Sequence, residues 1–249
     1  MSEAFKKFQL VVLESPIENW SDPAVQKLFN KMVTLKKNGY ESRYSQGVLP
    51  VDTSDFFATH VLLCEKKINN DLNPIMGYKT VSLSKCLQYN QNFPGLGLVQ
   101  SANATEHISV VKDIVQRCSQ NNTGLSYLGS WTIDPEFKNR CPQDVHLKSA
   151  FITFYHQLYQ EQGIKEVLIG GTLRFKTEKL FAELGHRPLS KDGKDLSNIF
   201  VTHLVKEPVL VMHATQFLTP PTLQTKIWQQ IWDERRVLGS SYAKLRLAA

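Results

Sequence analysis

Apolar positions along the chain fall into two kinds of run, and each kind predicts a different element. Short runs that are continuously apolar or alternating predict β-strands. They lie at residues 8–13, 57–64, 75–83, 125–133, 167–169, 198–205 and 208–214. Apolar positions three and four residues apart predict amphipathic helices. They lie at residues 23–38, 105–118, 144–162, 173–184 and 222–238.

Capping and loop-forming residues indicate where these elements begin and end. Asp22-Pro23 is typical of a helix start with proline in the first turn, and Asn38-Gly39 predicts the end of that helix. Thr105 is expected to cap the helix that follows it. Asn, Gly and Pro occur throughout residues 84–104, which are predicted to be irregular, and residues 134–143 are predicted to form a loop.

The order of elements predicts an α+β fold. The short strand at 167–169 follows a long helix, which implies a parallel β-α-β crossover, whereas the hairpins at 57–83 and 198–214 are antiparallel. We therefore expect a central, mixed, mostly antiparallel sheet with flanking helices and one parallel crossover. Residues 1–220 form one domain with a helical insertion at 84–124. Residues 221–249 add a C-terminal helix and a basic tail that pack on that domain.

Composition and charge narrow the classes of partner. An apolar fraction of 42% over 249 residues excludes a disordered or collagen-like protein. The 29 Lys and Arg against 23 Asp and Glu give a net charge of +6, which favours an acidic partner: nucleic acid, anionic lipid, a phosphorylated cofactor or an acidic carrier protein. Because the densest basic cluster, Arg235, Arg236, Lys244 and Arg246, contains no long basic run, nucleic acid is not the partner we expect.

Cysteine spacing and hydropathy argue against a disulfide framework, a metal site and a membrane span. None of the four cysteines belongs to a C-x-x-C pair, so we predict neither a disulfide framework nor a metal site. No stretch approaches the ~20 apolar residues of a membrane span, and the apolar stretch near the start is too short for a signal peptide. We expect a cytoplasmic protein.

Candidate chemistry gathers where the strand at 125–133 leads through a basic segment into the long helix. Lys138 and Arg140 lie there, just before a helix N-terminus with unpaired backbone N–H groups. Such an arrangement can hold pyrophosphate or phosphopantetheine. An ordinary solvated loop is the alternative.

Three segments resemble a known family. The strand, loop and helix over 125–162, then Val167-Leu168-Ile169 and the segment from Leu180 to His186, are similar to the GCN5-related N-acetyltransferase (GNAT) fold. In that family a segment like Leu180 to His186 closes the second helix. The resemblance implies a GNAT-like sheet and a donor that is a phosphopantetheine thioester, either acyl-CoA or acyl carrier protein. No metal is implied.

Upstream motifs resemble one branch of that fold, the acyl-homoserine-lactone (autoinducer) synthases and the long-chain N-acyl amino acid synthases. The motifs are Gly39-Tyr40-Glu41, the segment from Leu49 to Asp55, the segment from Ala58 to Leu62, and Gly77. These enzymes take fatty acyl groups from acyl carrier protein or acyl-CoA. Their helical insertion, which corresponds to 84–124 here, helps to enclose the acyl chain.

The resemblance also implies roles for individual residues. Asp52 and Asp55 would help to seat the amine acceptor, although a loop with Asx-turns is the alternative. Acyl transfer to an amine also needs a base, for which Glu106, His107 and His60 are candidates unless His60 is a core histidine, and an acid, for which Tyr127 and Tyr155 are candidates. The donor would lie along the strand and loop at Ser130, Trp131, Thr132, Ile133, Lys138, Asn139 and Arg140. A backbone N–H between 130 and 132 would stabilise the carbonyl oxygen.

Departures from the family pattern keep two functions open. The family's general-acid tyrosine would fall at Phe181. Near the usual glycines this chain has Asn139, Cys141 and Gln143. Lys79-Thr80 replaces the usual arginine of the strand after Gly77. The first hypothesis is an acyltransferase with a small amine acceptor and, as a partner, acyl carrier protein. The alternative is a binding or regulatory protein that keeps the fold without the chemistry.

Overall fold

The computed structural model describes residues 3–44, 47–69, 71–201, 206–219 and 224–239. They divide into two compact units. The first unit comprises residues 1–79, 130–157 and 221–249, and the second comprises residues 80–129 and 158–220. Each unit is described by itself. The predicted basic residues Lys244 and Arg246 lie outside the described residues.

Strands of the first unit run in the order β11-β1-β2-β3. β1 (Phe8–Glu14) pairs antiparallel with β2 (Thr59–Lys66), and β3 (Leu72–Ser82) completes the predicted hairpin. On its other side β1 pairs parallel with β11 (Arg236–Leu238), a stretch that the sequence predicts as helix. The last helix, α9 (Thr225–Asp233), is therefore shorter than expected and the chain turns back as an edge strand.

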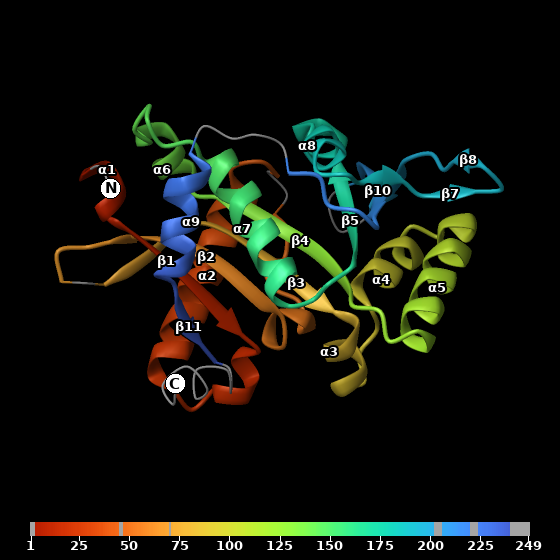
Figure 1. The fold of residues 1–249 in the computed structure, drawn as a ribbon, viewed down its shortest axis with the longest axis horizontal. Helices are drawn as coiled ribbons and strands as arrows, with labels where there is room; N and C mark the ends of the chain where they lie inside the picture. The colour runs from red at the N-terminus through yellow and green to blue at the C-terminus, as the bar shows by residue number, and fades with distance from the viewer. Residues whose placement is uncertain (1–2, 45–46, 70, 202–205, 220–223, 240–249) are drawn as a thin grey trace. The chain divides into compact units, whose positions relative to one another are not determined.

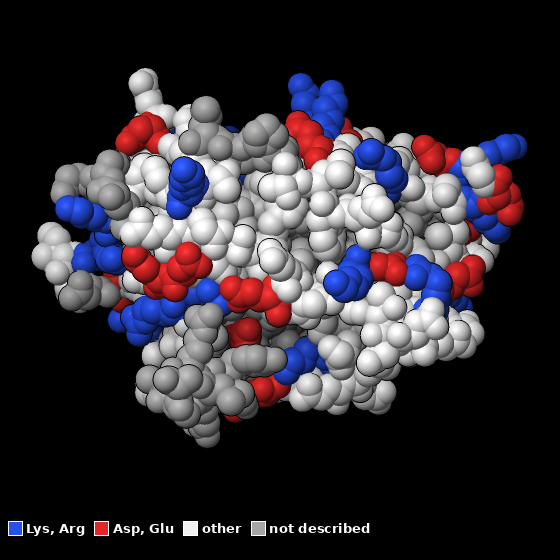
Figure 2. Space-filling view, viewed as in Figure 1, with Lys and Arg blue, Asp and Glu red and all other residues white. Residues whose placement is uncertain are grey.

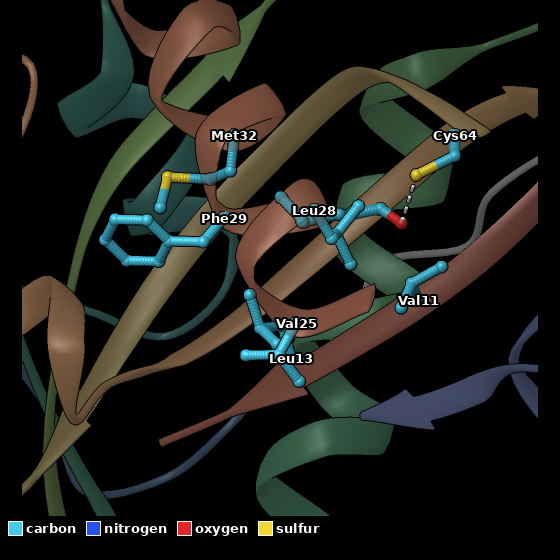
Figure 3. Packing of buried hydrophobic residues seen from close by; sticks show 8 residues of the cluster. Val11, Leu13, Val25, Leu28, Phe29, Met32 and Cys64 are labelled. Carbon is cyan, nitrogen blue, oxygen red and sulfur yellow. Dashed lines mark hydrogen bonds between the residues drawn. The ribbon is translucent and has the colours of Figure 1, made fainter. Parts of the chain in front are cut away.

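One helix packs its apolar stripe on these strands. α2 (Pro23–Glu41) begins where Asp22 caps Ala24 N, as predicted. Its buried residues meet β1 and β2 in a core cluster that Figure 3 shows from close by. The members are Val11, Leu13, Val25, Leu28, Phe29, Met32, Leu62 and Cys64.

The predicted stop of α2 at Asn38-Gly39 is wrong, because the helix continues to Glu41 and Gly39 lies buried inside it. A Cβ at Gly39 would lie 2.2 Å from Cγ2 of Thr132. The glycine thus serves a close approach between α2 and β4 (Leu125–Ile133), and it does not end the helix.

Strands of the second unit run in the order β4-β5-β10-β6, with β9 also on β10. The first half of β4 pairs parallel with β5 (Glu166–Thr172) over Leu125–Leu128, and the chain between them passes through α6 (Pro135–Arg140) and α7 (Leu147–Glu161). β10 (Glu207–Ala214) pairs antiparallel with β5, β6 (Arg187–Pro188) and β9 (Ile199–Val201). These pairings confirm the predicted class: a mixed, mostly antiparallel sheet with one β-α-β crossover.

Residues 84–104, predicted to be irregular, are mostly helical. α3 (Leu83–Gln88) and α4 (Pro94–Ser101) precede α5 (Thr105–Gln120). α4 packs on α5 and on β5 (Figure 1). Thr105 is not the cap of α5, because Ala104 occupies that position without a side-chain hydrogen bond. Pro94 explains why residues 84–104 were predicted to be irregular: proline usually breaks a helix, but in the first turn it is compatible with one, and here it begins α4.

Several connections also differ from the prediction. The 134–143 loop contains the short helix α6, which Asp134 caps through Phe137 N. The helix predicted at 173–184 divides into η3 (Leu173–Phe175) and α8 (Thr177–Glu183), separated by Lys176 in the left-handed conformation. A small hairpin, β7 (Ser190–Lys191) with β8 (Lys194–Asp195), was not predicted.

Candidate functional site

Asp52 and Asp55 lie at the two ends of a short 3-10 turn, η2 (Thr53–Phe56), which orients both carboxylates. Asp52 Oδ1 accepts a hydrogen bond from Ser54 N at 2.8 Å, and Asp55 Oδ2 accepts one from Asp52 N at 2.8 Å. This reciprocal capping box fixes the turn ahead of β2. The Asx geometry that the sequence suggests is therefore present, and it serves to aim the two side chains.

Two lysines face these carboxylates. Lys79 of β3 donates to Asp52 Oδ2 at 2.7 Å and to Asp55 Oδ2 at 3.0 Å, and Lys36 of α2 donates to Asp55 Oδ1. Asp55, Lys36 and Lys79 are nearly inaccessible, with side-chain exposures of 1%, 3% and 4%, whereas that of Asp52 is 63%. Asp52 is therefore the member of this lysine–aspartate network that a solute can touch.

The network shifts the titration of its members. Burial raises the pKa of Asp55, but the nearby charges of Lys36 and Lys79 outweigh it and hold the pKa well below its ordinary range. Burial lowers the pKa of Lys36 to about 8 against the attraction of Asp55. The pKa of Asp52 is also lowered, because the charge of Lys79 and hydrogen bonds from Lys79 and Ser54 outweigh burial. Both carboxylates are ionised at neutral pH.

His60 of β2 is a buried member of the same neighbourhood. Its Nε2 lies 2.7 Å from Asp55 O, which makes Nε2–H the donor, and its ring meets Phe29 edge to face. Burial lowers its pKa to about 4 although Asp55 favours the charged form. The imidazole is inaccessible, so His60 cannot reach an acceptor in this structure.

Tyr40 links this network to β4. It lies in the last turn of α2, forms a side-chain hydrogen bond with Ser130, and feels the charges of Lys79, Asp55 and Asp52. Burial raises its pKa above the ordinary value. Ser130 itself has φ of 57°, the left-handed conformation that a serine rarely adopts inside a strand. The backbone of β4 therefore departs from extended geometry at the position where the sequence predicts the donor.

The residues after Ser130 return to the core. Thr132 is buried and its Oγ1 donates to Ser130 O at 3.0 Å. Trp131 stacks on Phe151 with ring centroids 4.5 Å apart, and its buried Nε1 has no hydrogen-bond partner among the described residues. Ile133, half-buried, ends the strand. Phe151 is fully buried here, so the aromatic side chains of α7 serve as core at this point.

The three predicted phosphate-binding residues lie in α6, and they differ in availability. Arg140 forms a two-point ion pair with Glu65 of β2, at 3.0 and 2.7 Å, and this pair lowers the pKa of Glu65 to about 2. Lys138 and Asn139 are exposed, and Lys138 makes no ion pair within the described part of the chain. Arg140 is thus engaged inside the protein, and Lys138 is the available cation of α6.

The amides before α7 are also less available than the sequence suggests. The side chain of Gln224, at the start of α9, accepts a hydrogen bond from His146 N at 3.1 Å and donates one to Asp144 O. One of the N–H groups expected to bind phosphate is therefore already satisfied.

Glu106 and Tyr127 belong to the second unit. Glu106 is exposed in the first turn of α5, where a carboxylate is favoured by the helix dipole. Tyr127 is half-buried in β4, edge to face with Phe93. Phe181, at the position of the family's acid, is buried in α8. The structure thus brings Asp52, Asp55 and Ser130 into one cluster in the first unit, and it describes Glu106 and Tyr127 apart from that cluster.

Sequence reasoning missed Lys36 and Tyr40 as members of the site. Lys36 follows Val25, Leu28, Met32 and Leu35 on the buried side of α2, and a charged residue within an apolar stripe was the available signal. Lys79 stands as a departure from the family pattern, and the structure shows it binding both aspartates.

Charges elsewhere are interspersed. On the face drawn in Figure 2, Lys and Arg lie among Asp and Glu, and neither positive nor negative charge dominates that face. The described residues contain no group of three His, Cys, Asp or Glu side chains placed to hold a metal ion. Within the same residues, none of the helices combines the length and the apolar character that a membrane crossing requires.

Comparisons with known proteins give structural likenesses only. No family model matches the chain, and no curated protein matches it. Among solved structures it is similar to FeeM, an N-acyl amino acid synthase from uncultured soil microbes: 12% identity, 90% of this chain, 93% of that one, TM-score 0.48. It is also similar to BjaI, a CoA-dependent acyl-homoserine lactone synthase (11%, 94% of each chain, TM-score 0.48). The third is the AHL synthase LasI (12%, 94% and 98%, TM-score 0.46).

Proposed function

We propose that this protein is an N-acyltransferase that moves an acyl group from a phosphopantetheine thioester to a small amine. One observation carries the proposal: the Tyr40 hydroxyl interacts with Ser130, the left-handed residue of β4, and lies in the field of Asp52 and Asp55. The residue expected beside the donor and those expected to seat the acceptor thus belong to one cluster.

Acceptor binding follows from the exposure and charge of Asp52. Its ionised carboxylate is accessible, while Lys79 and Ser54 hold it in place from the buried side. An ammonium group of an amine substrate would be attracted to it. Because its pKa is lowered, Asp52 is a weak base, and its role is to bind and orient the amine. Asp55, which is buried, acts through Asp52 and Lys79.

The transfer itself requires little of the protein. The bound ammonium first loses one proton, and the neutral amine nitrogen then forms a bond to the thioester carbonyl carbon. The carbon–sulfur bond breaks, the nitrogen loses a second proton, and the thiolate takes up a proton and leaves as the thiol. A backbone N–H near Ser130, where the backbone departs from extended geometry, would stabilise the carbonyl oxygen as its negative charge grows. His60 is too buried and too weakly basic to take the amine proton; Glu106 remains the proposed base, acting through water, and Tyr127 the proposed acid.

On the donor side, Lys138 is assigned to the phosphates, with Asn139 beside it. Arg140 orients α6 through Glu65 and contributes charge at longer range. Trp131 supplies an indole N–H that is unpaired among the described residues, next to Ser130. The donor is acyl-CoA or acyl carrier protein, and this choice is part of the test.

The test measures thiol release and product together. Purified protein is incubated with acetyl-, octanoyl- or palmitoyl-CoA, or with the same acyl groups on acyl carrier protein, plus a mixture of amino acids and other small amines. Free thiol and acylated amine are followed by a thiol reagent and by mass spectrometry. We expect amide product with one acyl length, loss of rate in Asp52→Asn, and an unchanged rate in the exposed control Lys194→Gln. Absence of both donor binding and product would contradict the proposal.

A second candidate is a non-catalytic binding protein on the same fold. Phe181 at the acid position is buried, and Gln224 already occupies an amide before α7. This candidate predicts that acyl-CoA or acyl carrier protein binds in calorimetry while no amine is acylated, and that Asp52→Asn leaves donor binding unchanged.

A further inference from the structure

The second unit contains an open cavity of about 620 Å³ that shares no residue with the candidate site. α5 contributes Val110, Ile114 and Arg117 to the lining, and Arg187 and Leu189 come from the segment after α8. His213 of β10 also lines the cavity. Cavities of this size are typical of small-molecule sites.

The lining is positive. Among the described residues, it contains two arginines and a histidine and no Asp or Glu. Arg117 is neutralised, because it forms a two-point ion pair with Glu166, at 2.5 and 2.7 Å. His213 Nε2 lies 2.8 Å from Glu166 Oε2, and burial lowers the pKa of His213, so the imidazole adds no charge at neutral pH.

Arg187 is left as the uncompensated cation. Its Nη1 donates to two backbone carbonyls, Ala182 O at 3.2 Å and His186 O at 3.1 Å, and it makes no ion pair with any residue that the structure describes. These two bonds hold the exposed guanidinium in place through Nη1, and its other nitrogens make no hydrogen bond to the described residues. A guanidinium held in this way is suited to a carboxylate or phosphate group.

The remaining lining combines apolar side chains with the polar residues Ser190, Thr215 and Gln216. Val110, Ile114 and Leu189 provide hydrocarbon surface, with Pro188 and Leu218 beside them. An inorganic anion alone would leave this surface in contact with water, whereas an anion with an apolar body would cover it. The charge of Arg187 and the apolar side chains together favour an organic anion with an apolar body.

We propose that this cavity binds a small organic anion, its carboxylate or phosphate group on Arg187 and its apolar body against Val110 and Ile114. The site belongs to the second unit alone and does not depend on the proposed acyl transfer. It would give the protein a third ligand, besides the donor and the acceptor.

The test uses the full chain and three naphthalene probes in calorimetry: naphthoate, naphthyl phosphate and the neutral naphthamide. We expect the two anions to bind one per chain, and naphthamide to bind about tenfold more weakly or not at all. The tighter of the two anions identifies the head group. Arg187→Gln should weaken both anions by about tenfold, because it removes the charge but keeps a polar side chain. The exposed control Lys194→Gln should bind as the wild type does.

A cavity-filling variant makes the test independent of Arg187. Val110→Trp should weaken the anions and naphthamide alike, and thermal unfolding confirms that each variant is folded. Equal binding of acid and amide, equal binding by Arg187→Gln and Lys194→Gln, or no binding of any probe would overturn the proposal. Because none of these variants touches the candidate acyl-transfer site, failure here leaves the thiol-release result unaffected.

Discussion

Lys79 and Asp55 form a buried ion pair in the first unit, with 3.0 Å between Lys79 Nζ and Asp55 Oδ2. Lys36 holds the other oxygen of the same carboxylate, and Asp52 supplies the second negative charge. Two cations and two anions thus balance in a region largely closed to water. The balance matters because a buried charge without a partner is costly, so the loss of one member affects the others.

Replacing Lys79 with Met should destabilise the protein by about 3 kcal/mol, because both aspartates then lose their shared partner. Urea unfolding followed by circular dichroism measures the change. Lys37→Met is the control: it also replaces a lysine with methionine, but Lys37 of α2 is exposed and its pair with Glu41 is worth less than about 0.5 kcal/mol. Equal effects of the two substitutions would show that the network contributes nothing to stability.

The two aspartates should separate function from stability. Asp52→Asn alters an exposed carboxylate and should change the free energy of unfolding by less than about 1 kcal/mol, while KM for the amine rises severalfold. Asp55→Asn removes a buried charge between two lysines and should cost about 3 kcal/mol. Denaturant unfolding and amine titration on both variants check this. A stable Asp55→Asn protein with normal kinetics would contradict the assignment.

The effect of Gly39→Ala on stability should depend on which residue stands at position 132. In the wild type, Gly39→Ala places a Cβ 2.2 Å from Thr132 Cγ2 and should destabilise by about 2 kcal/mol. Thr132→Ser removes that methyl and keeps the hydroxyl. In this background Gly39→Ala should be neutral or stabilising, since alanine is favoured over glycine in a helix by ~0.5–1 kcal/mol. A double-mutant cycle in urea measures the coupling, and additive effects would argue against the close approach.

These examples show which parts of the fold the sequence predicts. The strand at 125–133 and the antiparallel hairpin that became β2 and β3 were predicted because the alternation of apolar residues reports burial directly. Gly39 was misread as a helix end because its partner, Thr132, is remote in sequence. Residues 236–238 were misread as helix because their pairing with β1 is a long-range contact that periodicity does not report.

The candidate site was predictable only in part, for the same reason. Asp52 and Asp55 stand close together in the sequence and were found, whereas Lys36 and Lys79 meet them only through the packing of α2 and β3. The left-handed backbone of Ser130 has no sequence signal, since glycine or asparagine is the usual residue there. Arg140 was assigned to phosphate binding because the sequence does not report its ion pair with Glu65 of β2, which is remote in sequence.

The two cations of α6 should behave differently. Lys138→Glu reverses an available charge and should weaken acyl-CoA binding severalfold with little change in stability. Arg140→Gln should mainly release Glu65 and lower stability by about 1 kcal/mol, with a smaller effect on donor binding. Calorimetry with acyl-CoA and acyl carrier protein, together with unfolding curves, distinguishes them. Donor binding that is insensitive to Lys138→Glu would remove α6 from the donor site.

His60 should make stability depend on pH in the acid range. Its pKa is about 4 in the folded protein and 6.5 in the unfolded chain, so between these values the unfolded state binds more protons. Stability contributed by the neutral imidazole is therefore complete above pH 6.5 and decreases as the pH falls toward 4, by a total on the order of 3 kcal/mol. Asp55, Lys36 and Lys79 face the ring; of these, Asp55 opposes the shift.

Comparing the wild type with His60→Gln isolates the contribution of His60 to the pH dependence of stability. Glutamine keeps a hydrogen-bond donor for Asp55 O but does not titrate. The difference between their unfolding free energies, measured in urea at several pH values, should be constant above pH 7 and shift against the wild type as the pH falls from 6.5 to 4. His186, whose pKa burial lowers to about 3, destabilises both proteins equally on acidification and cancels in the difference. A difference that stays level across this range would mean that His60 is not held neutral in the folded state.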